Sequence, residues 1–198
     1  MPQLLLATRN NKKKTELQQL LSKADLTLLT LNDIKEIPEI VEDGSSFEEN
    51  AIKKARETAA WSGYVCLADD SGLVVDVLNG QPGIFSARFA GEDATDESNN
   101  EKLLDMMRGI EEGCRTARFV CVIAISTPDG KTETVCGCCE GRIALAPGGS
   151  EGFGYDPLFI PVGYDKSFGE LPAQIKNTIS HRAVALARCV PKLEKLLG

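Results

Sequence analysis

Histidine is nearly absent from this sequence: His181 is the only one in 198 residues. A zinc site built from two or three histidines is therefore excluded within one chain, and carboxylates would have to hold any metal. Basic residues are also outnumbered, with 22 Lys and Arg against 29 Asp and Glu and a formal net charge of -7. Because duplex binding draws most of its affinity from basic residues that neutralise phosphates, we expect no nucleic-acid partner.

Long apolar runs are missing as well. The longest strongly apolar stretch, residues 119–125, is far shorter than the roughly 20 residues that cross a bilayer, so we expect no membrane partner. The seven cysteines are an odd number, and no secretory signal precedes them, since Met1-Pro2-Gln3 leads directly into a strand-like run. We therefore expect thiols in a reducing cytoplasm rather than disulfides.

The first part of the chain has the pattern of alternating strands and helices. The expected elements are strands over residues 3–7, 26–31 and 65–68, a helix that carries Leu17, Leu20 and Leu21, and a second helix over residues 46–63. Ser46 followed by Glu49 is a capping-box signature at the start of the second helix. The strand over residues 65–68 is predicted to end abruptly at Asp69.

The second part of the chain adds a hairpin. Pro128-Asp129-Gly130 joins two strand-like runs. The expected elements are a helix over residues 95–107, strands over 117–126, 132–138 and 158–161, and a C-terminal helix with Ala183, Leu186, Ala187, Val190 and Leu193 on one face and a kink at Pro191. Early alternation and a later hairpin favour an α/β protein with a mixed sheet, and we expect a single domain over residues 1–198.

Thr8-x-Asn10-x-x-Lys13 lies at a predicted strand-to-helix junction. The N-terminal amides of a helix favour phosphate, Thr8 and Asn10 can donate hydrogen bonds, and Lys13 adds a full charge. The segment lacks the glycines of a P-loop. A solvated helix start with surface lysines is an equally good interpretation of the spacing.

Asp69-Asp70-Ser71-Gly72 follows a buried strand, at the end where α/β sheets place ligands. Successive side chains of a strand point to opposite sides, so we expect the two aspartates to divide their duties. Magnesium favours one or two carboxylates plus phosphate oxygens; the alternative is a capped turn. The preceding acidic loop offers further carboxylates, at Glu36, Glu39, Glu42 and Asp43. One of them could complete a metal site, and a solvated charge run is an equally good interpretation.

Two later segments could bind a ligand. In residues 152–157, glycines allow close backbone approach, Phe153 and Tyr155 offer flat faces to a nucleobase, and Asp156 can accept hydrogen bonds from it; such loops often only turn. In residues 176–182, His181 stands beside Arg182, which suits anion or carbonyl recognition, although a lone histidine is more often structural. Cys136-Gly137-Cys138-Cys139 lacks a second cysteine pair, so structural thiols are favoured over zinc.

Taken together, these segments resemble the inosine triphosphate pyrophosphatase family. The motifs occur in the family's order and span nearly the whole chain. They are Thr8-x-Asn10-x-x-Lys13 with Glu16, Phe47-Glu48-Glu49-Asn50-Ala51, Ala68-Asp69-Asp70-Ser71-Gly72-Leu73, Pro82-Gly83-Ile84-x-Ser86-Ala87-Arg88, Phe153-Gly154-Tyr155-Asp156-Pro157 and Lys176-Asn177-x-x-Ser180-His181-Arg182.

The resemblance implies a two-lobed α/β fold with a mixed central sheet, a deep cleft between the lobes and usually a homodimer. It implies magnesium-dependent hydrolysis of ITP, dITP and XTP to the monophosphate and pyrophosphate. The implied roles are phosphate binding by Thr8, Asn10 and Lys13; catalysis by Asp70 with Asp69 beside it; substrate contact by Ser71; metal binding by Asp70 and Glu42, with Glu39 in reserve; a base pocket lined by Phe153, Gly154 and Tyr155; and base-edge reading by Asp156, Lys176, His181 and Arg182.

Two other functions remain open at this point. A nucleotide-binding sensor could have kept the pocket and lost turnover, with Arg9 and Lys12 as signs of drift from the family pattern. A phosphatase could use Asp69 or Asp70 as a covalent nucleophile, although the Asp-x-Asp pair typical of that chemistry is missing.

Overall fold

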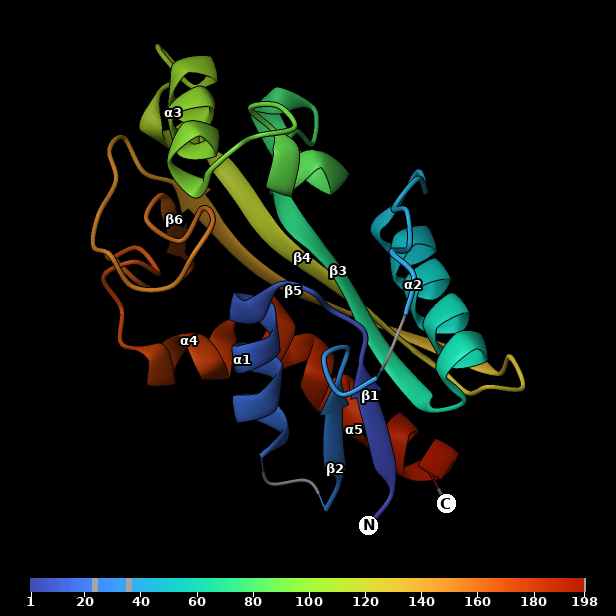
Figure 1. The fold of residues 1–198 in the computed structure, drawn as a ribbon. Helices are drawn as coiled ribbons and strands as arrows, with labels where there is room; N and C mark the ends of the chain where they lie inside the picture. The colour runs from blue at the N-terminus through green and yellow to red at the C-terminus, as the bar shows by residue number, and fades with distance from the viewer. Residues whose placement is uncertain (23–24, 35–36, 198) are drawn as a thin grey trace. The chain divides into compact units, whose positions relative to one another are not determined.

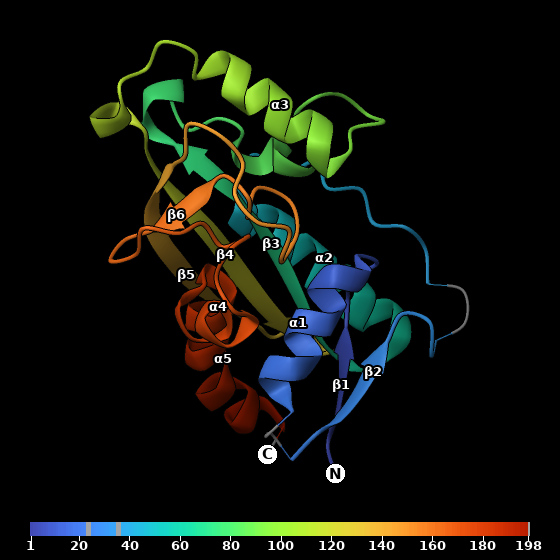
Figure 2. The same ribbon diagram turned by 90° about the vertical axis from the view of Figure 1, so that its left-hand side faces the viewer.

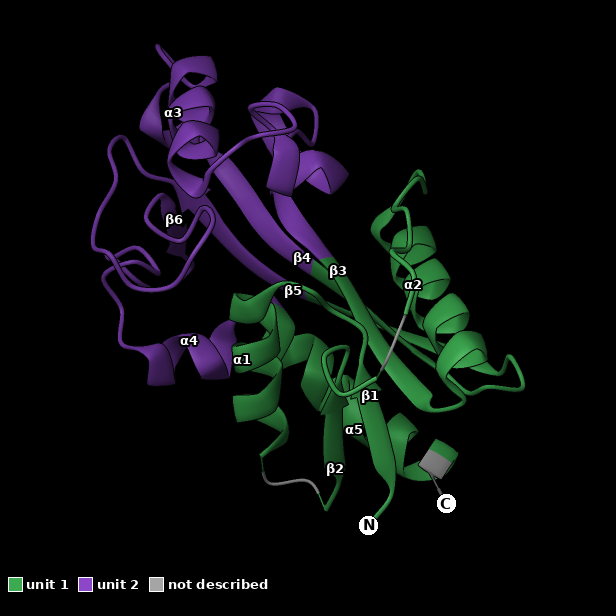
Figure 3. Ribbon diagram, in the orientation of Figure 1, with its two compact units in different colours: residues 1–70, 121–137, 182–198 green, residues 71–120, 138–181 purple. Residues whose placement is uncertain are grey.

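The computed structural model describes residues 1–22, 25–34 and 37–197. Six strands form one sheet in the order β2-β1-β3-β4-β5-β6 (Figure 1). The chain divides into two compact units: unit 1 is Met1–Asp70, Cys121–Gly137 and Arg182–Gly198, and unit 2 is Ser71–Val120 and Cys138–His181 (Figure 3). Strands β3 (Val65–Val75), β4 (Thr116–Ser126) and β5 (Thr132–Ile143) each run through both. That residues 1–198 act as a single domain stays a prediction.

Unit 1 has three layers. Its remaining elements are β1 (Gln3–Leu6), α1 (Asn11–Leu21), β2 (Thr27–Thr30), α2 (Phe47–Ser62) and nearly all of α5 (His181–Leu197). Leu4 and Leu67 pack with α1 and α5 on one face of the sheet, while Leu5 and Ala68 pack with the narrow alanine face of α2 on the other. The two views in Figures 1 and 2 both show α2 opposite α1 and α5 within this unit. Because helices cover both faces of the sheet here, β1 and the first part of β3 carry apolar side chains on both faces.

Strand β3 continues past the aspartates. The prediction that it ends at Asp69 is wrong, because the strand runs to Val75. Its parallel partner β1 stops earlier: Leu6 pairs with Leu67, and Ala7 N donates to Leu67 O before the chain leaves the sheet. Asp69 and Asp70 therefore lie just beyond the point where β1 stops pairing with β3.

Unit 2 has its own core. Its further elements are η1 (Asp76–Leu78), η2 (Gly83–Arg88), α3 (Asp96–Met106), η3 (Glu112–Cys114), β6 (Phe159–Pro161) and α4 (Ala173–Ile179). Leu103 and Met107 pack with Phe119, Phe159 and Phe168 in one buried cluster. Strand β6 pairs antiparallel to β5, whereas β1 pairs parallel to both β2 and β3. The predicted mixed sheet is confirmed.

The two ends of α2 lie where the cap and glycine signals predicted them, with one difference in the capping contacts. Ser46 Oγ accepts from Glu49 N, and Gly63 ends α2 in the left-handed conformation at φ 75°. The predicted reciprocal half of the capping box is replaced, because the Glu49 carboxylate accepts from Ser45 N and Oγ. In α5 the predicted apolar face is partly wrong: Ala187 is exposed, and Ala185 and Cys189 are buried instead.

Candidate active site

Asp69 is the buried centre of an ion-pair cluster in unit 1. Its side chain is fully buried, and Oδ2 lies 3.1 Å from Arg182 Nη2 and 3.2 Å from Lys13 Nζ. Arg182 Nη1 also donates to Glu16 Oε2. Lys13 and Glu16 come from α1 and Arg182 from the first turn of α5, so the cluster joins the two helices that cover this face of the sheet.

Asp70 faces the opposite helix. Asn50 Nδ2 donates to Asp70 Oδ2 at 3.1 Å, and Lys54 Nζ lies 3.9 Å from Asp70 Oδ1. The same ammonium lies 3.1 Å from Glu42 Oε1 and donates to Asp69 O at 2.7 Å. Asn50 and Lys54 are four residues apart on α2 and so share one face of that helix. The expected division between the aspartates is confirmed in their surroundings, and strand alternation is its cause.

The two carboxyl groups are pushed in opposite directions. Burial by itself would raise the pKa of Asp69, but the charges of Lys13, Arg182 and Lys54 outweigh it and hold that pKa well below its usual range. Burial raises the pKa of Asp70, and the Glu42 charge adds to this effect, while Lys54, Lys13 and the Asn50 hydrogen bond oppose it. Paired titratable groups whose environments separate them in this way are typical of acid–base sites.

The start of α1 differs from the predicted phosphate cradle in one respect. Asn10 is the N-cap, and its Oδ1 accepts from Lys12 N and Lys13 N. Two of the amides that a phosphate would have used therefore already have an acceptor. Asn10 N donates to Thr8 Oγ1 at 3.2 Å, which holds Thr8 at the end of β1. The chemistry left for an anion here is the Lys13 charge and the polar groups of the Thr8 and Asn10 side chains.

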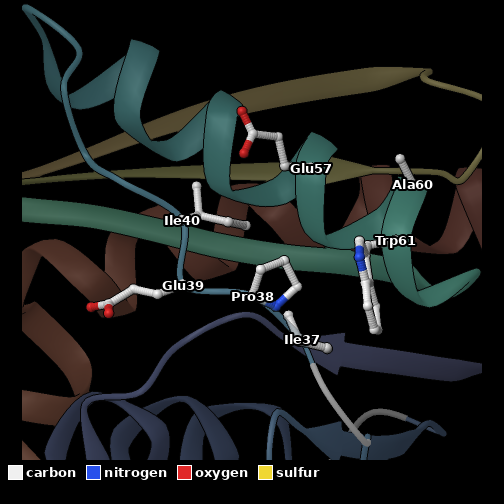
Figure 4. Close-up of a pocket in the computed structure, with 7 residues that line it drawn as sticks. All are labelled: Ile37, Pro38, Glu39, Ile40, Glu57, Ala60 and Trp61. Carbon is white, nitrogen blue, oxygen red and sulfur yellow. The ribbon is translucent and has the colours of Figure 1, made fainter.

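The acidic loop separates its carboxylates. Glu42 shares Lys54 with Asp70, and Asp43 pairs with Lys53. Glu39 instead lines a pocket of about 430 Å³, whose other lining residues are Ile37, Pro38, Ile40, Glu57, Ala60 and Trp61 (Figure 4). Glu36 lies outside the described residues. The geometry therefore associates Glu42, and not Glu39, with Asp70.

In unit 2 the loop over residues 152–157 is braced from within. Asp156 Oδ2 accepts from Phe153 N at 2.8 Å and from Lys176 Nζ at 2.6 Å. Lys176, itself 6% exposed, also lies over the Phe153 ring at 4.8 Å from its centroid. Gly152 has φ 75°, and a Cβ there would lie 2.0 Å from Asp156 Oδ2, so this position requires glycine.

Tyr155 and His181 are more buried than their expected roles suggest. Tyr155 is 4% exposed, packs in the unit 2 core, and donates its hydroxyl to Ser86 O; burial also raises its pKa. The His181 ring stacks on Phe119, with centroids 4.7 Å apart and planes 15° apart. Of the two aromatic residues in the loop, Phe153 is the one that is partly exposed. The assignment of Tyr155 and His181 to a base pocket stays a prediction.

The carboxylates that could hold a metal ion are those of Asp70 and Glu42, which approach the same Lys54 ammonium. Within the described residues, no group of three or more His, Cys, Asp or Glu side chains is placed to hold an ion. Also within that part of the chain, no helix is both long and apolar enough to cross a membrane.

Comparison with known proteins identifies the group to which these features belong. A model of the Ham1 family matches residues 4–192. The chain belongs to the Ham1 family. It is 47% identical over 193 residues to the dITP/XTP pyrophosphatase of Desulforamulus reducens, across 98% of this chain and 96% of that protein, and 49% identical over 187 residues to that of Geobacter sulfurreducens, across 94% of each.

Solved Ham1 structures have the same fold. The HAM1 protein from Coxiella burnetii matches with a TM-score of 0.89 and 40% identity over 98% of this chain and 100% of that one. The Ham1 protein from Staphylococcus aureus matches with a TM-score of 0.87 and 39% identity over 98% of each chain. These matches confirm the α/β fold class and the family resemblance that the six motifs indicated.

Several contacts that organise this Ham1 site were not predicted from the sequence. Lys54 is the clearest case: it lies one helical turn after Asn50, so the helical period was the signal that could have found it. Arg182 was expected beside Lys176, but it binds Asp69 and Glu16. Asp96 and Asn100, which contact the loop over residues 152–157, carry no local signal for that contact.

Proposed function

We propose that this protein hydrolyses non-standard purine nucleoside triphosphates such as ITP, dITP and XTP to the nucleoside monophosphate and pyrophosphate, and so cleanses the nucleotide pool. The observation that carries the proposal is the adjacent Asp69–Asp70 pair, in which Asp69 meets Lys13 and Arg182 while Asp70 meets Asn50 and Lys54. The relatives named dITP/XTP pyrophosphatase, which match over nearly the whole chain, support the substrate class.

Lys13, Thr8 and Asn10 would bind the triphosphate. The Lys13 side chain is 17% exposed, and its ion pair with Asp69 fixes the ammonium at the start of α1. Ser71, the half-buried residue after Asp70, would contact the substrate. Asp69 is suited to positioning, because it holds Lys13 and Arg182 in place. The same geometry favours a positioning role for Arg182 over the base-edge role that we expected.

Asp70 and Glu42 would hold a divalent cation, for which we propose Mg²⁺. The donor set fits, because both carboxylates already meet one positive group, the Lys54 ammonium, and oxygen ligands are those that magnesium prefers. Two carboxylates leave room for phosphate oxygens and water, as is usual for this ion. When bound, the cation would draw charge from the phosphates and make water more acidic.

Asp70 is also placed to accept a proton from the attacking water or to position that water, because its carboxylate lies beside the Asn50 amide and the Lys54 ammonium, beyond the end of the β1–β3 pairing. The water oxygen bonds to phosphorus, the phosphoanhydride bond between the α- and β-phosphates breaks, and pyrophosphate leaves. Such a step depends on positioning and charge neutralisation more than on covalent help, which Lys13 and its anchor Asp69 supply.

Unit 2 carries the groups for the base. Lys176 and His181 would donate to the 6-oxo group, Phe153 would offer its ring face, and Gly154, Tyr155 and Asp156 would frame them. A base with a 6-amino group would place a hydrogen-bond donor against these donors. The buried donors would then lack acceptors, and this cost discriminates strongly against 6-amino purines such as adenine. The brace from Asp156 to Lys176 supports a fixed donor position.

Product analysis tests the proposal. Incubation of the protein with ITP and Mg²⁺ should give IMP and pyrophosphate; IDP with orthophosphate as products would refute it. The Asp70→Asn variant keeps the side-chain size and should lower kcat by about 10²- to 10⁴-fold with the fold intact. Binding of ITP by the wild-type protein without any turnover would instead establish the nucleotide-binding sensor.

We further propose a cytoplasmic homodimer. Among the described residues, which include all seven cysteines, none is in a disulfide, which supports a reducing compartment. The dimer rests on the family resemblance, and light scattering tests it: a particle of 21.4 kDa, the mass of one chain, would refute it.

A further inference from the structure

Helix α3 holds the backbone of Gly154 at both of its polar atoms. Gly154 N donates to Asp96 Oδ2 at 3.0 Å, and Asn100 Nδ2 donates to Gly154 O at 2.9 Å. Asp96 and Asn100 are four residues apart and therefore share one face of the helix. Both bonds lie within unit 2. The two peptide groups that flank the Gly154 Cα are thus each held by a side chain of the same helix.

The helix is itself well anchored. Thr95 and Ser98 form a complete capping box at its start, and Leu103 is fully buried in the core. Asn99, beside Asn100, accepts from Ala90 N and donates to Ala87 O. Because Asn99 bonds to the end of η2 and to Ala90 just after it, while Asn100 bonds to Gly154, the first turns of α3 hold two separate segments of unit 2.

Gly154 lies between the residues that face the base in the proposed function. Phe153 N and Lys176 Nζ both donate to Asp156 Oδ2, so one carboxylate oxygen links Phe153 and Lys176. The internal brace fixes their arrangement relative to one another. The contacts from Asp96 and Asn100 fix Gly154 to helix α3. Errors of about 1 Å in such positions cost up to about 10²-fold in rate.

We propose that Asp96 and Asn100 are positioning residues that set purine selectivity by fixing the Phe153–Gly154 backbone. The inference rests on the proposed function, because it concerns the base-recognition part of that site. The Asp96 bond is charge-assisted and therefore the stronger of the two. Asn100, which is 9% exposed, acts from a position that a nucleotide does not have to touch.

The experiment measures kcat and KM for ITP, XTP, GTP and ATP. Asp96→Ala removes the acceptor for Gly154 N, whereas Asp96→Asn keeps one at the same reach. Asn100→Asp turns a carboxylate toward Gly154 O in place of a donor. Glu97→Ala is the matched control, because it removes an exposed acidic residue from the same helical turn.

Asp96→Ala and Asn100→Asp should each lower the ratio of kcat/KM for ITP over that for GTP by about tenfold, the effect of losing about one hydrogen bond. The change should lie in KM, since the Asp69–Asp70 cluster is untouched. Asp96→Asn keeps the acceptor and loses only its charge, so it should recover most of the wild-type ratio, and Glu97→Ala should not alter it. If Asn100→Asp does not fold, the Asp96→Ala and Asp96→Asn pair decides.

Selectivity within twofold of wild type in Asp96→Ala would overturn the inference, as would an equal loss of kcat for all four nucleotides, which is the mark of a merely structural role. Failure of the proposed function is distinguishable: the wild-type protein itself would then release no pyrophosphate from ITP or XTP.

Discussion

Replacement of Asp69 by Asn probes the buried charge cluster directly. The substitution keeps the shape of the side chain and removes its charge. At an effective dielectric constant of about 20, a charge pair at the 3.1 Å separation of Asp69 Oδ2 and Arg182 Nη2 is worth about 5 kcal/mol before desolvation. Truncating one partner of a buried pair typically costs about 3–5 kcal/mol.

The lower end of that range applies here. Arg182 keeps its ion pair with Glu16, and the Lys13 side chain, 17% exposed, can turn toward water. We therefore expect Asp69→Asn to lower the free energy of unfolding by about 3 kcal/mol and Tm by about 6–12 °C. Urea titration and calorimetry measure both quantities. Asp105→Asn, which breaks an exposed ion pair with Arg108, is the control and should leave both unchanged within error.

The same ion pairs make stability depend on pH. Because the folded state holds the pKa of Asp69 below its unfolded value, its contribution is complete above the unfolded pKa of about 3.9 and is lost as pH falls through the folded pKa. Asp69→Asn should thus differ from wild type at pH 6 and converge with it toward strongly acidic pH. A loss of less than about 1 kcal/mol at pH 6 would refute the account of a desolvated charge held by Lys13 and Arg182.

The remaining predictions concern the metal, the loop glycine and the thiols. Glu42→Gln should raise the Mg²⁺ concentration needed for half-maximal activity about tenfold or more, because it removes one of the two proposed carboxylate ligands. Glu39→Gln is the control. An unchanged Mg²⁺ titration in Glu42→Gln would contradict the assignment of Glu42 as a metal ligand. Gly152→Ala should lower Tm by more than Gly130→Ala does. Both glycines have positive φ, but an added Cβ would clash with Asp156 at position 152 and would meet no described atom within 4 Å at position 130. Equal Tm values for the two variants would contradict this prediction. In the native protein a thiol reagent at pH 8 should modify the exposed Cys114, Cys136 and Cys138. Cys66, Cys139 and Cys189 should react only on unfolding, because burial raises their pKa to about 11, 11 and 12. Mass spectrometry identifies the modified thiols, and modification of a buried thiol first would contradict this prediction.

Local rules predicted the parts of the site that local geometry controls. Strand alternation was enough to separate the surroundings of Asp69 from those of Asp70, and the cap and glycine signals were enough to place α2 between Ser46 and Gly63. The length of β3 was not accessible in this way. Aspartate is uncommon in strands, but here the ion pairs with α1, α2 and α5 compensate both charges and the strand continues to Val75.

The roles of polar residues that meet across long sequence distances could not be predicted. Arg182 lies beside His181 in sequence, yet Asp69 and Glu16 bind its guanidinium, because successive residues in the first turn of α5 point in different directions. Nothing in the sequence indicated that the Tyr155 ring packs in the core and that its hydroxyl donates to Ser86 O, 69 positions away. Such contacts depend on the packing of whole elements, which no local pattern encodes.

The placement of Asp69 and Asp70 on opposite faces of β3 constrains how this gene can change in length. Deletion of Ala68, or insertion of one residue between Leu67 and Asp69, would exchange the two faces, because side chains alternate with a period of two. The carboxylate that now meets Lys13 and Arg182 would face Asn50 and Lys54 instead. Substitutions elsewhere in the strand alter packing by degrees, but a change of one codon here would invert the electrostatics of the pair, so only length changes of two residues keep the order of faces.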